Sequence, residues 1–289
     1  MPEITLCAFA DESGAKIETQ IENLVANGIY NVELRSVDGI NVGDFTEEKA
    51  REVYERFASC GIKVWSLGSP LGKIDITAPK EKHFELLKNL VRMAKIVNTD
   101  KIRMFSYFMK RGEYDLYRDE VIYRLGEMTA YAADNGITLC HENESEIFGA
   151  TVDNCVYISD NVPGIKVVYD PANFIMWDED IDYAMEKLYD KALYFHIKDV
   201  IRESKTIVPA GYGDGQIDRM VKMLDRDATF TLEPHLHVFD GYGSIDKKQL
   251  KNKFSYKSQP QAFKASADAF KTILKNNGYR EEDKGIWKK

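Results

Sequence analysis

The chain has 289 residues, 44% hydrophobic and 30% charged, a composition typical of a soluble globular protein that can bury a full core. Its 39 basic and 47 acidic residues give a net charge of −8, which argues against a nucleic-acid-binding protein. The four cysteines form no CxxC pair, so neither a zinc ribbon nor a disulfide framework is expected. The first ten residues lack the features of a signal peptide, and no apolar run is long enough to span a membrane. We therefore expect a cytoplasmic protein.

Short β-branched or aromatic runs alternate with longer amphipathic stretches. The short runs predict eight strands, at 4–10, 30–35, 63–67, 101–107, 137–142, 165–170, 192–198 and 229–233. The amphipathic stretches predict helices at 16–26, 46–59, 79–97, 116–135, 151–160, 181–189, 217–224 and 259–276. This alternation predicts an α/β fold with parallel strands, and eight units fit a single (β/α)8 TIM barrel better than an open sheet. No shift in composition divides the chain, so residues 1–289 are expected to form one domain with a peripheral, polar tail at 278–289.

Acidic and imidazole side chains stand at the carboxyl ends of four consecutive predicted strands. They are Glu142, Asp170, His196 and Glu233, spaced by 28, 26 and 37 residues. Each spacing is about one strand–helix unit, and TIM barrels carry their active sites at the carboxyl ends of the strands. A single glutamate in such a position is more often a helix cap or a surface residue. Four in succession, inside apolar runs, favour a metal site, because buried carboxylates are costly unless they are paired or bind a metal.

Three carboxylates and one imidazole form an oxygen-rich ligand set. Such a set suits Mn²⁺, Mg²⁺ or Co²⁺ and tolerates Zn²⁺, so we expect one divalent metal ion, with Mn²⁺ as the first candidate. Alternation along a strand predicts that His141 points away from its neighbour Glu142. His141 is then either a group behind the ligands or one that reaches the site past the end of the strand.

Five motifs carry a resemblance to a known family. They are His141-Glu142-Asn143-Glu144, Tyr169-Asp170-Pro171-Ala172-Asn173-Phe174, His196-Ile197-Lys198-Asp199, Gly211-Tyr212-Gly213-Asp214-Gly215 and Leu232-Glu233-Pro234-His235. In this order and spacing they resemble the xylose-isomerase-like superfamily of sugar isomerases and epimerases, also called the AP-endonuclease-2-type barrel, over essentially the whole chain. The resemblance implies the same four metal ligands and a small carbohydrate substrate. It specifies no single reaction.

For ketose 3-epimerases, the resemblance implies that Glu142 and Glu233 also act as the acid/base pair. A proton would leave the carbon next to a carbonyl and return to either face through an enediolate. The 3-epimerases have a histidine at the position of Asn173, and His141 is not part of their usual pattern. The His-Glu-Asn motif instead is similar to barrel proteins that act on 3-keto glycosides, including C-glycoside deglycosidases. In that alternative, a lyase or hydrolase, His141 or a metal-bound base would take the proton.

Two further classes complete the alternatives. An AP-endonuclease-like nuclease is disfavoured by the acidic charge and by the single set of four ligands, and no nucleic acid or membrane partner is expected. A non-enzymatic binding module remains open, although a buried acidic cluster argues for chemistry. A homo-oligomer is compatible with the sequence.

The remaining candidates are expected to bind substrate. Glu33 could bond a sugar hydroxyl, orient a ligand, or simply form an ion pair at the barrel mouth. Lys198 is expected to face the barrel with His196, and His235 to reach the mouth with Glu233. The full set of expected substrate-binding residues is Glu33, Lys73, Asn173, Lys198, Asp214 and His235.

A long segment, 236–256, follows the last predicted strand. Long loops in compact domains are often functional lids, and Phe239, Tyr242 and Phe254 could stack on a sugar face there. The alternative is a contact between subunits.

Overall fold

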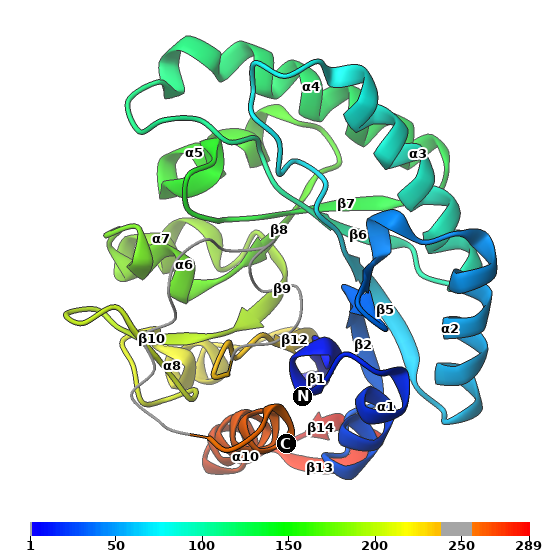
Figure 1. Cartoon of the computed structure of the whole chain (residues 1–289). Helices are drawn as coiled ribbons and strands as arrows, with labels where there is room; N and C mark the ends of the chain where they lie inside the picture. Colours follow the sequence, from blue (N-terminus) through cyan, green and yellow to red (C-terminus); the bar gives the residue numbers. More distant parts are fainter. Residues whose placement is uncertain (1, 238–255) are drawn as a thin grey trace.

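Eight parallel strands close into a barrel in the computed structural model, which describes residues 2–237 and 256–289 (Figure 1). They are β1 (Glu3–Ala8), β2 (Asn31–Leu34), β5 (Lys63–Gly68), β6 (Lys101–Met104), β7 (Thr138–Glu142), β8 (Lys166–Tyr169), β9 (Ala192–Ile197) and β12 (Ala228–Leu232). The last strand pairs with the first in parallel, with Ile4 opposite Ala228. This pairing closes the sheet and confirms the predicted (β/α)8 barrel.

Helices surround the barrel on its outside (Figure 1). They are α1 (Ile17–Ala26), α2 (Glu47–Ser59), α3 (Lys80–Ile96), α4 (Tyr114–Asp134), α5 (Val152–Asn161), α7 (Ile181–Leu188), α8 (Ile217–Lys222) and α10 (Gln259–Asn276). Thr46 caps α2 by accepting a hydrogen bond from the amide of Lys49, as its position before an amphipathic run predicts. An extra short helix, α6 (Pro171–Met176), directly follows β8, and Asp170 is its N-cap residue. Across the described residues, no helix has both the length and the apolar character needed to cross a bilayer.

The loops between strands and helices contain short 3₁₀ helices and hairpins. Among the described residues, three 3₁₀ helices span Ala10–Ser13, Val42–Asp44 and Phe148–Ala150. Two antiparallel hairpins, β3 (Ser36–Val37) with β4 (Ile40–Asn41) and β10 (Asp199–Ile201) with β11 (Thr206–Val208), follow β2 and β9. All of these elements lie in loops at the carboxyl ends of barrel strands, where TIM barrels build their sites.

The barrel interior has an apolar layer below its polar mouth. Cys140, Val168 and Tyr194 are fully buried there and pack with Trp65. A much larger apolar cluster fills the space between the strands and the surrounding helices. Cys7 and Cys140 are both fully buried in the interior. The polar mouth of the barrel therefore lies directly above a close-packed apolar layer.

The C-terminal tail forms a β-hairpin instead of the peripheral extension expected from its polarity. Its strands are β13 (Arg280–Asp283) and β14 (Ile286–Lys288), and β14 pairs antiparallel with the first half of β1. On that side, β2 pairs with β1 only at Cys7 and Ala8, so the hairpin takes the place that β2 leaves open. Trp287 of the hairpin is fully buried in the core. Burial of this ring explains why a mostly polar tail is ordered against the barrel.

Candidate metal centre and active site

The four predicted ligands converge at the carboxyl end of the barrel. Glu142 ends β7, Asp170 follows β8, His196 lies in β9 and Glu233 follows β12, and these strands are neighbours in that order. Each residue offers one ligand atom, and these atoms all lie within 4.8 Å of one another. All four side chains are buried. The one-ligand-per-strand pattern in the sequence thus becomes a single compact cluster.

The two ring nitrogens of His196 have different surroundings. Nδ1 lies 3.0 Å from Oε1 of Glu142 and 3.2 Å from Oε2 of Glu233. Nε2 lies 3.2 Å from Oε2 of Glu33, whose other oxygen accepts a hydrogen bond of 2.9 Å from the hydroxyl of Tyr194. A carboxylate that accepts the Nε2–H fixes the tautomer and leaves the Nδ1 lone pair for a metal. Glu33 thus lies behind the histidine, below the mouth.

Lys198 supplies a positive charge within the cluster. Its ammonium lies 2.9 Å from Oδ2 of Asp170 and 3.5 Å from Oε2 of Glu233. Burial would lower the pKa of Lys198, but these carboxylates raise it well above its ordinary value. Burial would likewise raise the pKa of Glu233, but Lys198, His196 and His235 together hold it well below its usual range. Glu233 is therefore ionised at neutral pH.

Each of the two glutamate ligands is held from behind by an arginine. Arg35 donates to Oε1 of Glu233 at 2.9 Å, and Nε of Arg103 lies 3.3 Å from Oε2 of Glu142. In both glutamates the other oxygen, Oε2 of Glu233 and Oε1 of Glu142, faces Nδ1 of His196. Each arginine therefore orients its carboxylate so that one oxygen points to the centre of the cluster.

Three features of the cluster fit a divalent cation. The donor set of three carboxylate oxygens and one imidazole nitrogen is that of a hard or borderline ion. Ligand atoms this close together can all reach an ion at bond lengths of about 2.0–2.5 Å. Burial raises the pKa of Asp170 to about 6 although Lys198 opposes the shift, so its ionised form would gain from a further positive charge.

Two other predicted residues lie against the cluster. The amide nitrogen Nδ2 of Asn173 donates to Oε1 of Glu142 at 3.3 Å, and the backbone amide of Asn173 is capped by Asp170 at 3.1 Å. Nε2 of His235 lies 3.5 Å from Oε1 of Glu233 and 3.4 Å from Oε1 of Glu12. Asn173 and His235 thus flank the ligands from opposite sides, on the loops after β8 and β12.

Lys73 lies further out, at the edge of the mouth. Its ammonium is 3.5 Å from Oε2 of Glu144 and 4.3 Å from the centre of the Phe105 ring. Glu144 follows the ligand Glu142 by two residues, so this pair borders the cluster without being part of it. Burial lowers the pKa of Lys73, and the nearby charge of Arg103 adds to that effect.

His141 and Asp214 are not brought to the cluster. Nε2 of His141 lies 2.9 Å from the hydroxyl of Ser106, and its ring packs against Gly149, on the other face of β7 from Glu142. Burial lowers the pKa of His141 to about 3, so the ring is neutral. Asp214 is exposed and accepts a hydrogen bond from the amide of Arg202 at 2.7 Å. Alternation predicted the orientation of His141, whereas nothing in the Gly-rich motif fixed that of Asp214.

Asp199 organises the glycine-rich loop that contains Asp214. Its carboxylate accepts hydrogen bonds of 2.8–3.0 Å from the amides of Gly211, Gly213 and Gly215, and one of 2.9 Å from its own neighbour Val200. A Cβ at Gly213 would lie 2.4 Å from Oδ1 of Asp199, so the close approach requires glycine. The motif thus shapes a loop around Asp199.

Several residues of the site were not identified from the sequence. Asp11 binds Arg35 through two bonds of 2.8 and 2.9 Å, and Glu12 adds a third contact at 3.3 Å. The side chain of Asn143 joins two ligand loops by bonding the backbone N–H and C=O of Asp170. Asp11 and Glu12 directly follow the first strand, so the search for polar strand ends could have found them. The contact of Tyr194 with Glu33 could not be found in this way, because Tyr194 lies inside an apolar run.

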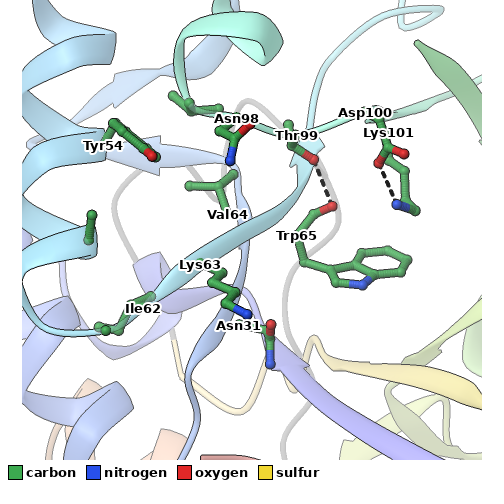
Figure 2. A pocket seen from close by; sticks show the side chains of 13 residues that line it. Asn31, Tyr54, Ile62, Lys63, Val64, Trp65, Asn98, Thr99, Asp100 and Lys101 are labelled. Atoms are coloured by element: carbon green, nitrogen blue, oxygen red, sulfur yellow. Dashed lines mark hydrogen bonds and ion pairs between the residues drawn. The ribbon is translucent and has the colours of Figure 1, made fainter. Parts of the chain in front are cut away.

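A cavity of about 470 Å³ lies at the other end of the barrel, where β2, β5 and β6 begin. Figure 2 shows Trp65 and Lys101 there, with the Thr99 hydroxyl donating to the Trp65 carbonyl. The lining holds one carboxylate, that of Asp100, which is paired with Lys101. The described lining residues of this cavity offer no set of acid, base and ligand groups, unlike the cluster at the opposite end of the barrel.

The fold and the buried four-ligand cluster define a TIM-barrel protein with a candidate metal centre at its mouth. Residues 21–274 match the family model of the xylose isomerase-like TIM barrel, and the chain belongs to that family. No curated protein matches the chain in sequence.

Solved structures with the same fold cover nearly the whole chain. A D-psicose 3-epimerase in the presence of D-fructose is 14% identical, with a TM-score of 0.72 over 95% of this chain and 99% of that chain. The IOLI protein with a zinc atom is 14% identical, with a TM-score of 0.71 over 94% and 99%. The probable 3-DHS dehydratase AsbF from Bacillus anthracis is 16% identical, with a TM-score of 0.67 over 94% and 99%. At these identities the likeness establishes the fold alone.

Proposed function

We propose that this protein is a divalent metal-dependent isomerase or epimerase of a carbohydrate, in which a proton leaves the carbon next to a carbonyl and returns through an enediolate. The observation that carries this proposal is the placement of Glu142 and Glu233 on either side of Nδ1 of His196, at 3.0 and 3.2 Å. The two carboxylates come from β7 and β12, which are separated by β8 and β9. A substrate carbon between them could lose a proton to one and regain it from the other.

The chain's own residues would hold one divalent cation through Glu142, Asp170, His196 and Glu233, with Mn²⁺ as our first candidate. Such a cation, when bound, polarises a carbonyl and stabilises the negative charge that develops on its oxygen. Lys198 would hold a hydroxyl or carbonyl oxygen of the substrate beside Asp170 and Glu233. Asn173 and His235, which flank the cluster, would bond further hydroxyls of the substrate.

Glu233 can accept the proton because its carboxylate is ionised and stands opposite Glu142 across Nδ1 of His196. His141 is less suited, because its ring bonds Ser106 on the other face of β7. We therefore assign the acid/base work to the two glutamates and a supporting role in the fold to His141.

The test combines metal content with proton exchange. Purified protein is compared with a Glu142→Gln/Glu233→Gln double variant and with Glu120→Gln, a control on α4. We expect about one metal ion per chain in the wild type and the control, none in the double variant, and metal-dependent exchange of a C–H proton with deuterated solvent on one member of a ketose panel. A wild type that takes up no divalent metal on reconstitution would refute the proposal. Release of an aglycone from a 3-keto glycoside would instead identify the lyase alternative.

A further inference from the structure

A cavity of about 930 Å³ opens at the carboxyl end of the barrel, next to the four-ligand cluster. Loops after β5, β6 and β7 and the end of α6 line it. Two lining residues, Lys73 and Glu144, form the pair that borders the cluster. The volume lies near the upper end of the range for small-molecule pockets, which is about 300–1,000 Å³. The space beside the cluster is therefore larger than one sugar ring needs.

The lining of this cavity suits a neutral ring. Three aromatic side chains, those of Phe108, Tyr117 and Trp177, contribute to it. Its charged residues are nearly balanced, with three cations and four carboxylates: Lys73, Lys110, Arg111, Asp75, Glu113, Glu144 and Glu146. The guanidinium of Arg111 lies over the ring of Trp177, 5.2 Å from its centre. The cavity thus has no excess of positive charge that would select a phosphate.

The spacing along α6 separates the aromatic end of the cavity from the cluster. Asp170 is the N-cap of this helix and Trp177 is its C-cap, with six helical residues between them. At about 1.5 Å per residue, the two caps lie roughly 10 Å apart along the helix axis. A single sugar held at the ligands would leave the Trp177 end of the cavity to water.

We infer that the substrate carries a second, neutral ring joined to the reacting sugar, and that this second ring binds in the cavity beside Trp177. The inference rests on the proposed function for the position of the reacting sugar. A second sugar and an aromatic aglycone share the required chemistry, because both present a flat apolar face that can stack on an aromatic side chain. Where an aglycone occupies the anomeric carbon, the reacting carbonyl lies at another carbon of the sugar. Free monosaccharides are then incomplete ligands.

Binding of matched glycosides to the Mn²⁺-loaded full-length protein tests this inference. The probes are the phenyl and methyl glycosides of glucose, galactose and xylose, together with cellobiose, measured by calorimetry. We expect a phenyl glycoside or cellobiose to bind about tenfold more tightly than the matching methyl glycoside. We expect Trp177→Ala to remove this preference. If the Trp177→Ala variant does not fold, the Trp177→Leu variant is used in its place. Tyr123→Ala, at an exposed ring on α4, keeps the preference.

The outcomes separate the inference from the proposed function. Equal binding of phenyl, methyl and disaccharide probes, no binding of any probe, or an equal loss of all binding in the Trp177 variant would overturn the inference. Metal content, and deuterium exchange on the ketose panel, are recorded on the same samples. Retained metal without a ring preference refutes only the inference. A Trp177-dependent preference in a protein that takes up no metal supports the ring site and refutes the metal-dependent reaction.

Discussion

Glu33 and His196 lie 3.2 Å apart, with Oε2 of the carboxylate next to Nε2 of the ring. This contact turns Nδ1 of His196 toward Glu142 and Glu233. A metal-binding histidine commonly donates its second N–H to a carboxylate, which fixes the ring and raises its basicity. Glu33 is not a candidate ligand itself, but we expect its contact with His196 to influence the affinity of the site for a metal ion.

Glu33→Gln tests that role. The amide cannot accept the Nε2–H as strongly as a carboxylate, so we expect the affinity for Mn²⁺ to fall by about 10- to 100-fold. A titration of metal-free protein in competition with a chelator measures the change. Glu47→Gln, on the exposed side of α2, is the matched control and should leave affinity unchanged. Unchanged affinity in Glu33→Gln would mean that the contact does not act on the metal centre.

The clustering of the four candidate ligands could be predicted from the sequence because each stands where a strand ends, and a closed barrel brings all such ends together. The role of Glu33 could not be decided in the same way. Its partner His196 is 163 residues away, and an ion pair at the barrel mouth was as good an explanation of the sequence. In the structure, the nearby cation Arg35 bonds Asp11 and Glu233. Which cation faces which carboxylate depends on rotamers, and sequence spacing does not fix those.

Lys198→Met should make folding depend strongly on metal. In the metal-free protein, Lys198 pairs with Asp170 and Glu233, and its loss leaves buried carboxylates without that charge. We expect the variant to lose about 3 kcal/mol or more of unfolding free energy in chelator. Mn²⁺ should restore a large part of this loss, because a cation supplies positive charge to the same oxygens. Urea unfolding with and without Mn²⁺ gives both values. If Mn²⁺ stabilises the variant no more than the wild type, the lysine and the metal do not share these ligands.

The buried side chain of His83 should lower the free energy of unfolding at acidic pH. Burial, with a smaller effect of Arg124, lowers the pKa of His83 to about 4, and its Nε2 accepts a hydrogen bond from the amide of Gly72. The unfolded chain takes up this proton near its ordinary pKa of about 6.5, so the stabilisation is complete above that pH and is lost as pH falls toward 4. The difference corresponds to about 3 kcal/mol.

The variant His83→Gln isolates this contribution, because glutamine can accept the same hydrogen bond but does not titrate. Between pH 7 and 4, the unfolding free energy of the wild type should fall by about 3 kcal/mol more than that of the variant. Urea unfolding at a series of pH values measures both curves. Parallel curves for the two proteins would show that His83 does not titrate on unfolding.

The tail and the glycine-rich loop show what the sequence patterns left undecided. Residues 278–289 are mostly polar, so they looked like a surface extension, yet a single buried ring at Trp287 ties them to the barrel. The motif 211–215 suggested Asp214 as a substrate contact, whereas the buried carboxylate that bonds the amides of this motif is Asp199 of β10, fourteen residues before Gly213. In both cases one long-range contact decides the arrangement. The expected lid at 236–256 lies outside the described residues, except at its two ends.

Trp287→Ala tests whether the hairpin is part of the barrel. Removing a fully buried tryptophan should cost about 3–5 kcal/mol of unfolding free energy. Affinity for Mn²⁺ should not change, because β14 pairs with Glu3–Thr5 at the amino end of β1, whereas the ligands lie at the carboxyl ends of β7, β8, β9 and β12. Lys288→Ala, at an exposed position of the same strand, should cost less than about 0.5 kcal/mol. A cost below about 1 kcal/mol for Trp287→Ala would show that the barrel closes without the hairpin, and a loss of metal affinity would show that the two ends are coupled.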